Sequence, residues 1–372
     1  MKLLFWVSLC LIFFTYAGYP ICMYLRARCW PRPVRRARIF PRVTIILAAQ
    51  NEEKDLLRKL DNLAVLNYPA DRLEVIVVSD GSTDRTNKIL GAWQDSSHRA
   101  VILPKHHGKA DALNHGVAEA HGEIICFTDV RQTIASESLK NLISNFADVS
   151  VGCASGALLL GENESTPSSD GVGLYWRLEK NIRHWEGLGG STIGATGAFY
   201  AVRKDLLLPL PMGTILDDVY IPLQVARQGS RVVFDPEAVA WDDFMSSPKR
   251  EFRRKVRTLV GNYQLLQLAP WLLTGTNPLR LQLVCHKLLR LLVPFALVGV
   301  LVSTFCLRHG MYELALVIQI VLYTLAILTA LRAKLGVLTR LSNISLAFIV
   351  LNTAAAVALI YFIVGKKAVW AR

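Results

Sequence analysis

The chain has 372 residues, of which 52% are hydrophobic and only 19% are charged, with a formal net charge of +13. This length allows one sizeable domain and a further part, and the hydrophobic share exceeds that of an ordinary soluble domain. The basic residues gather in two clusters, at 26–42 and 249–257. No nucleic-acid-binding module accompanies them, so we expect no nucleic-acid partner.

Seven cysteines are scattered along the chain without CxxC spacing. An odd, unpatterned set argues against a disulfide framework or a zinc site. It fits a reducing compartment instead.

Residues 3–22 carry no charge and are long enough to cross a bilayer. A signal peptide is the competing interpretation, but no small-residue cleavage site follows the apolar stretch. We therefore expect a transmembrane helix in residues 1–25. The arginine-rich linker 26–42 would then lie on the cytoplasmic side by the positive-inside rule.

From residue 43 the pattern changes to short strands that alternate with amphipathic helices. Strands are predicted at 43–47, 73–78, 100–103, 124–127 and 232–234, and helices at 52–66, 84–93, 109–120, 175–185 and after Asp217. A polar loop is predicted at 161–170. Such alternation is typical of an α/β fold with a parallel, doubly wound sheet, which we place in residues 43–245.

The remaining residues return to membrane-like composition. An interfacial helix is predicted at 259–273, within a segment 246–280, and about three transmembrane helices within 281–372, near 288–306, 314–331 and 346–364. Four spans would place Lys366, Lys367 and Arg372 on the non-cytoplasmic side. This conflicts with the positive-inside rule, so either one stretch does not cross or the weak terminal charge is overruled.

Acidic residues follow three of the predicted strands, namely Glu52, Asp80 and Asp129. In open α/β sheets the ligand lies outside the carboxyl ends of the strands, where these side chains would meet. Asp129 could hold a metal ion or a ribose hydroxyl, and Asp80 a base or ribose. Each could instead belong to an ordinary turn. The turn that contains Asp80 could then lead into a helix with its N-cap at Thr83 or Asp84. Three acidic strand ends in one sheet favour a ligand site.

An ordered series of short motifs runs through residues 43–262. In chain order they are Gln50-Asn-Glu-Glu53, Ser79-Asp-Gly-Ser-Thr-Asp84, Gly108-Lys-Ala-Asp-Ala-Leu-Asn114, Phe127-Thr-Asp129, Gly194-Ala-Thr-Gly-Ala-Phe199 and Asp217-Asp218. The series closely resembles the inverting family-2 glycosyltransferases of the membrane-embedded kind, which include cellulose, chitin and hyaluronan synthases. The resemblance implies a nucleotide-sugar domain of the GT-A type, which is Rossmann-like.

It also implies roles for individual residues. Asn51, Glu52 and Asp80 would bind the nucleoside. Lys109 would approach the phosphates, although it could also be a solvated lysine at a helix start. Asp129 would be the first acid of the Asp-x-Asp motif.

The position of the second acid holds Arg131, which cannot ligate a cation. We expect Mg²⁺ or Mn²⁺ at Asp129, with help from Gln132 or a more distant group. Alternatively, Arg131 replaces part of the metal's charge by contacting phosphate.

The adjacent acids Asp217 and Asp218 stand where the family has its catalytic pair, and by position Asp218 would be the general base. Asp217 could at the same time be the N-cap of the helix that follows. Acceptor binding would involve Thr196 and Gly197.

The second basic cluster matches the family's Gln-x-x-Arg-Trp motif in part. Arg257 matches its arginine, whereas Arg254 and Thr258 replace glutamine and tryptophan. Arg254 and Arg257 would contact the leaving diphosphate, or the cluster could be the basic face of a helix on anionic lipid. The two substitutions leave processive synthesis without support.

The sequence thus predicts an integral membrane glycosyltransferase of polysaccharide biosynthesis with a cytoplasmic catalytic domain. It would transfer a sugar from a UDP-sugar, with inversion, to a growing glycan or a lipid-linked acceptor. Membrane lipid and export or accessory subunits are further expected partners. The alternative is an inactive nucleotide-sugar- or glycan-binding relative that serves as an assembly subunit. A transporter is disfavoured because the apolar segments lack internal symmetry and intramembrane acids.

Overall fold

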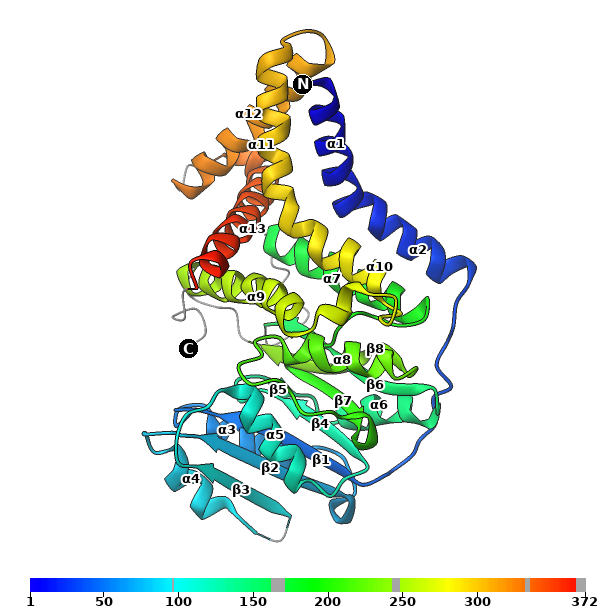
Figure 1. The fold of residues 1–372 in the computed structure, drawn as a ribbon. Helices are drawn as coiled ribbons and strands as arrows, with labels where there is room; N and C mark the ends of the chain where they lie inside the picture. Colours follow the sequence, from blue (N-terminus) through cyan, green and yellow to red (C-terminus); the bar gives the residue numbers. More distant parts are fainter. Residues whose placement is uncertain (96, 162–170, 243–247, 332–334, 366–372) are drawn as a thin grey trace.

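The computed structural model describes residues 1–95, 97–161, 171–242, 248–331 and 335–365. A bundle of long helices stands on an α/β domain, with α7 and α9 between the two (Figure 1). The predicted loop at 161–170 lies outside the described residues except for Gly161. The basic residues Lys366, Lys367 and Arg372 also lie outside them.

One eight-stranded sheet forms the centre of the α/β domain, in the order β3-β2-β1-β4-β7-β6-β8-β5. Its strands are β1 (Val43–Ala49), β2 (Leu73–Asp80), β3 (His98–Leu103), β4 (Ile124–Thr128), β5 (Thr133–Ile134), β6 (Val151–Leu160), β7 (Phe199–Arg203) and β8 (Arg231–Asp242). Strands β1 to β4 pair in parallel, which confirms the predicted half of the sheet.

The other half makes the sheet mixed rather than wholly parallel. Strand β7 runs antiparallel to both β4 and β6, while β6 and β8 are parallel. Strands β5, β6 and β7 were not predicted from the sequence. Strand β6 is rich in Gly, Ala, Ser and Cys and has a single β-branched residue, Val151, and β5 is only two residues long.

Both faces of the parallel half are buried, which explains its continuous apolar strands. Ile46 of β1 packs with Ile76 of β2 in one core, and their neighbours Ile45 and Val77 pack in the other. The helices of this domain are α3 (Leu56–Ala64), α4 (Thr86–Trp93), α5 (Lys109–Glu119), α6 (Ser138–Ser144) and α8 (Asp217–Arg227), with short 3₁₀ turns η2 (Ala70–Arg72), η3 (Asn145–Ala147) and η4 (Lys204–Leu206).

Two longer helices join this domain to the upper bundle. They are α7 (Gly171–Leu188) and α9 (Pro248–Leu268), the latter followed by the 3₁₀ turn η5 (Pro270–Leu273). The predicted helix 259–273 therefore differs in its bounds. Because proline disfavours helical backbone in the residue before it, Pro270 ends α9 early, whereas the helix starts well before residue 259.

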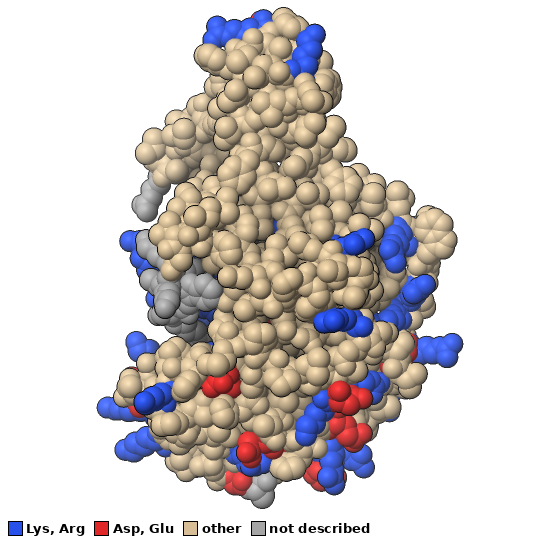
Figure 2. Space-filling model, viewed as in Figure 1, with Lys and Arg blue, Asp and Glu red and all other residues tan. Residues whose placement is uncertain are grey.

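Four helical segments of the described chain are long and apolar enough to cross a membrane, at 2–29, 280–307, 311–330 and 336–363. Their elements are α1 (Lys2–Phe13), η1 (Phe14–Gly18), α2 (Tyr19–Cys29), α10 (Arg280–Gln282), η6 (Leu283–Leu288), α11 (Leu289–Leu307), α12 (Met311–Ala330), η7 (Gly336–Leu338) and α13 (Thr339–Ile363). Figure 2 shows an almost charge-free band over these helices, between a basic tip and the charged α/β domain. Both observations fit the predicted transmembrane segments.

Candidate active site

The loops after β1 and β2 are tied together at the carboxyl edge of the sheet. The side-chain oxygen of Asn51 accepts a hydrogen bond from the backbone N–H of Thr83 at 2.8 Å. Asn51 itself has a positive φ of 54°, which asparagine tolerates better than most residues. The backbone N–H of Glu52 donates to Thr86 Oγ1 at 2.9 Å. The two predicted nucleoside-binding residues thus shape one surface with the second loop.

Asp80 ends β2 with its carboxylate buried. It accepts hydrogen bonds from the backbone N–H groups of His107 and Gly108, both at 2.8 Å, and lies 2.7 Å from Nδ1 of His106. The next residue, Gly81, has φ +62°, and a Cβ there would lie 2.3 Å from the backbone nitrogen of His106. Asp80 therefore shapes the loop that leads to Lys109, and its contact with a nucleoside stays a prediction.

Lys109 lies at the centre of the predicted site. Its Nζ is 2.9 Å from Oδ1 of Asp129 and 3.2 Å from Oδ2 of Asp217. Burial alone would lower the pKa of this lysine, but the two carboxylates outweigh burial and raise it, so the ammonium remains charged. The structure thus brings together residues from the start of α5, the end of β4 and the start of α8.

Asp218 follows in the first turn of α8, and its Oδ2 accepts a hydrogen bond from the backbone N–H of Gly197 at 3.1 Å. Burial, reinforced by the charge of Asp217, raises the pKa of Asp218 to about 6, although Lys109 and other cations oppose the shift. The suggestion that Asp217 is the N-cap is wrong, because α8 begins at Asp217 and Leu216 occupies the N-cap position. Likewise α4 begins at Thr86, with Arg85 rather than Thr83 or Asp84 at its N-cap position.

A second polar group surrounds Asp242, the last residue of β8. Its Oδ2 accepts hydrogen bonds from Arg131 Nη2 and, at 3.1 Å, from Gln132 Nε2, and it lies 3.7 Å from Nη1 of Arg254. Arg131 therefore pairs with a buried carboxylate in this structure. Arg257 lies half-buried on the same helix as Arg254.

The oxygen atoms in this group bear on metal binding. Gln132 Oε1 and Asp242 Oδ1 are buried and have no hydrogen-bond partner among the described residues. Oxygen atoms of this kind are the ligands that Mg²⁺ and Mn²⁺ prefer, although Arg131 and Arg254 already pair with the other oxygen of Asp242. The described residues contain no cluster of three or more His, Cys, Asp or Glu side chains that could hold one. An amide oxygen would therefore have to complete the ligand set.

A small cavity of about 60 Å³ opens beside Asp218. Its polar lining comes from Arg183 on α7, Thr258 and Asn262 on α9, and Lys287 on η6. The predicted acceptor-binding residues lie close by. Gly197 contacts Asp218, and the backbone N–H of Thr196 donates to Ser155 Oγ at 3.0 Å.

Sequence reasoning missed Asp242, Arg183 and Lys287. Lys287 stands just before a predicted apolar segment, where a lysine commonly anchors the helix end at the membrane surface, so it did not point to the site. Arg183 and Asp242 look like ordinary polar residues of their helix or strand.

Residues 44–208 match the family described as Glycosyl transferase family 2. The match covers a little under half of the chain. The probable glycosyltransferase YdaM of Bacillus subtilis (strain 168) is 27% identical over 238 residues, which cover 60% of this chain and 55% of that protein.

The poly-beta-1,6-N-acetyl-D-glucosamine synthase of Staphylococcus aureus (strain COL) matches an equal share of this chain. It is 23% identical over 229 residues, again covering 60% of this chain and 55% of the synthase. This chain therefore spans about half the length of the curated relatives it matches.

A solved structure matches nearly end to end. The mannosyltransferase PcManGT from Pyrobaculum calidifontis, solved in complex with GDP-Man and Mn²⁺, superposes with a TM-score of 0.73 and 23% sequence identity. The match covers 98% of this chain and 99% of that chain. This likeness, together with the family match, confirms the predicted GT-A type of fold.

Proposed function

We propose that the protein is an inverting membrane glycosyltransferase that uses Asp218 as its general base. The donor is a nucleoside-diphosphate sugar, with UDP-sugars the first choice and GDP-mannose, the ligand of PcManGT, the second. The acceptor is a growing glycan or a lipid-linked sugar. The observation that carries the proposal is Asp218, a carboxylate with a raised pKa beside the Lys109–Asp129 pair at the sheet edge.

The transfer would proceed as a single displacement. The acceptor hydroxyl oxygen forms a bond to the anomeric carbon as the bond from that carbon to the diphosphate oxygen breaks. The hydroxyl proton passes to Asp218, and Oδ1 is the suitable atom because Oδ2 already accepts from Gly197. The electron pair of the broken bond leaves with the nucleoside diphosphate. Attack from the side opposite the leaving group gives inversion.

The charge of the leaving diphosphate would be met by cations on this chain. Lys109 is the first candidate, because its ammonium lies at the sheet edge, in contact with Asp129 and Asp217. Arg254 and Arg257 on α9 are the further candidates, supported by their place in the partly matching family motif. Asn51, Glu52 and Asp80 would surround the nucleoside.

A divalent cation, Mg²⁺ or Mn²⁺, would be held by Asp129 with Gln132. Support comes from the buried amide oxygen of Gln132, and from the Mn²⁺ in the complex of PcManGT. When bound, such an ion supplies positive charge to the diphosphate in the transition state. Arg131 would contribute charge of the same sign if it turned from Asp242 toward phosphate.

We propose further that the catalytic domain faces the cytoplasm. The arginine-rich residues 26–42 lie directly after the first apolar helix, which supports this orientation by the positive-inside rule. Membrane lipid would surround the four apolar helices, and export or accessory subunits would move a long product across. Synthesis of a polysaccharide is supported by the names of the relatives alone.

The test uses the full chain purified in detergent, with a panel of UDP-sugars and GDP-mannose. Release of nucleoside diphosphate is measured with and without a chelator, and with added Mg²⁺ or Mn²⁺. Release with one donor that chelation abolishes and Mn²⁺ restores would support the metal-dependent transferase. Release that survives chelation would show that Lys109 and Arg131 suffice.

One observation favours a second candidate, a nucleotide-sugar- or glycan-binding relative without turnover. Arg131 replaces an acid of the family motif and is engaged with Asp242, and Thr258 replaces the tryptophan. In that case a donor would bind but no nucleoside diphosphate would be released with any glycan or lipid-linked acceptor.

A further inference from the structure

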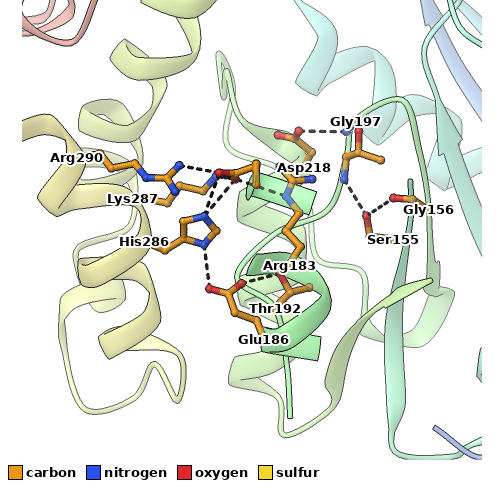
Figure 3. A network of polar contacts seen from close by, with 12 residues as sticks. Ser155, Gly156, Arg183, Glu186, Thr192, Gly197, Asp218, His286, Lys287 and Arg290 are labelled. Carbon is orange, nitrogen blue, oxygen red and sulfur yellow. Dashed lines mark hydrogen bonds and ion pairs between the residues drawn. The ribbon is translucent and has the colours of Figure 1, made fainter. Parts of the chain in front are cut away.

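A buried polar cluster joins the membrane-side helices to the catalytic domain. Figure 3 shows its side chains meeting between α7 and the segment that leads into α11. Its charged members are Arg183, Glu179 and Glu186 on α7, His286 and Lys287 on η6, and Arg290 on α11. None has a side chain more than 18% exposed.

Glu179 is the hub of the cluster. It lies 2.6 Å from Arg290 Nη1, 3.2 Å from Lys287 Nζ and 3.6 Å from Arg183 Nε. Burial alone would raise the pKa of Glu179, but Lys287, His286 and Arg290 outweigh it and hold the pKa well below its usual range. This carboxylate is therefore ionised and shared among several cations.

His286 connects the second carboxylate. Its Nδ1 is 2.9 Å from Glu186 Oε1, and its Nε2 is 3.2 Å from Glu179 Oε2. Glu186 also accepts hydrogen bonds from Tyr19 and Thr192. The imidazole ring of His286 therefore bridges the two buried carboxylates.

Three cations of this cluster, Arg183, Lys287 and Arg290, pair with Glu179. Two of them, Arg183 and Lys287, also line the cavity beside Asp218. A further anion in this cavity would meet the positive charge of both side chains.

The cavity shows where such an anion would lie. Arg183 and Lys287 form its wall together with Asp218, and Thr258 and Asn262 add a hydroxyl and an amide. The cavity, of about 60 Å³, has room for more than one water molecule. A phosphoryl group attached to a longer molecule is of suitable size and charge.

The position of the cavity indicates what carries the phosphoryl group. Lys287 belongs to the apolar helix 280–307, one of the four candidate membrane spans, and Arg183 to α7 beneath it (Figure 1). An anion held here lies at the base of the helical bundle, where a lipid headgroup arrives from the bilayer. The cations proposed for the donor diphosphate differ, because Lys109 contacts Asp129 and Asp217.

We propose that Arg183 and Lys287 form a binding site for the phosphate or diphosphate of a lipid-linked acceptor. The inference rests on the proposed function, because the phosphate is placed so that the acceptor's hydroxyl reaches Asp218. It selects the lipid-linked acceptor over a free glycan. Arg183 and Lys287 bind the acceptor and take no part in bond making.

The test measures lipid binding to the full chain in nanodiscs of zwitterionic phospholipid, by native mass spectrometry. The probes are a polyprenyl diphosphate and the neutral polyprenol of the same length, with inorganic pyrophosphate as competitor. The wild type should bind the diphosphate at least tenfold more tightly than the polyprenol. Arg183→Gln and Lys287→Gln should lose about tenfold to a hundredfold of that affinity, the usual effect of removing a charged hydrogen bond.

Two further variants guard against misfolding. Arg183→Lys keeps the charge and should retain most of the affinity. Arg177→Gln removes an exposed arginine of the same helix and should change nothing. Thermal unfolding of the same preparations shows whether each variant is folded, and nucleotide affinity is measured separately.

Three results would overturn the inference. They are equal binding of polyprenol and diphosphate, unchanged lipid affinity in both glutamine variants, and pyrophosphate binding as tight as that of the lipid. A parallel loss of nucleotide affinity in Arg183→Gln would assign the cluster to the donor site instead. If the wild type bound no donor at all, the proposed function would fail while the lipid result stood.

Discussion

The backbone amide of Gly197 donates a hydrogen bond to Oδ2 of Asp218 at 3.1 Å. This bond fixes the carboxylate to the 194–197 loop, whose Ala195 N–H also bonds the Asp218 carbonyl oxygen at 2.7 Å. One carboxylate oxygen is thereby occupied, and the other can take a proton.

Replacing Asp218 by asparagine should abolish transfer, because an amide cannot accept the hydroxyl proton. A loss of about 10²- to 10⁴-fold in kcat is the usual effect of removing a general base. Donor affinity, measured by calorimetry, should change little because the shape is kept. The exposed Asp205→Asn serves as the matched control. Full activity in Asp218→Asn would exclude Asp218 as the base.

The pH dependence of kcat should show an acid limb near pH 6. The pKa of Asp218 is raised to about 6 by burial and by Asp217, so activity is present above this pH and falls tenfold per unit below it. Lys109→Gln removes a charge that opposes the shift and should move the limb to higher pH. Single-turnover rates between pH 4.5 and 8 measure both, and a flat profile contradicts the assignment.

Gly197→Ala should slow the reaction without weakening donor binding. A Cβ at this position would lie 3.3 Å from Asp218 Oδ2, so the carboxylate would have to shift by a few tenths of an ångström. Displacements of this order cost roughly tenfold in rate when the group is a positioned base. Gly275→Ala, which meets no atom within 4 Å, is the control. An unchanged kcat would mean that the contact does not position Asp218.

Arg131→Ala should destabilise the domain, because it takes a partner from the buried carboxylate of Asp242. The expected loss is about 1–3 kcal/mol in the free energy of unfolding. Arg99 is an arginine of equal exposure, 36%, and pairs with Glu119, which is half-exposed, so Arg99→Ala should cost under about 1 kcal/mol. The pair is compared by thermal unfolding.

A second variant separates the ion pair from other effects of removing Arg131. The double variant Arg131→Ala, Asp242→Asn lacks the uncompensated charge and should recover part of the stability. If it is no more stable than Arg131→Ala, the loss does not arise from Asp242.

The parallel half of the sheet could be predicted from the sequence because its strands are buried on both faces. Ile45 and Ile46 of β1 enter opposite cores, so the strand is apolar at successive positions and stands out from the amphipathic helices. Strand β6 gave no such signal. Its small residues allow close packing, with Gly156 near the Ala238 carbonyl oxygen, and close packing cannot be recognised before the partner strand is known.

The candidate site was predictable where short motifs follow strands. Lys109, Asp129 and Asp217 come together, as expected from their places at one edge of the sheet. The pairing of Arg131 with Asp242 was not predictable, because 111 positions separate the two residues and only the β5–β8 contact brings them together. The same holds for Arg183 and Lys287, which come from two different helices.

The buried cluster at Glu179 and Glu186 also determines the order in which the molecule can be completed. Tyr19 comes from the first helix, the glutamates from the middle of the chain, and His286 from the second apolar segment. During synthesis the glutamates would lack their counter-charges until residues 286–290 had left the ribosome. A fragment that stops before residue 280 would lack His286, Lys287 and Arg290, so Glu179 and Glu186 would lose most of their partners. The face of the catalytic domain that carries these glutamates is therefore completed only when the second apolar segment packs against it.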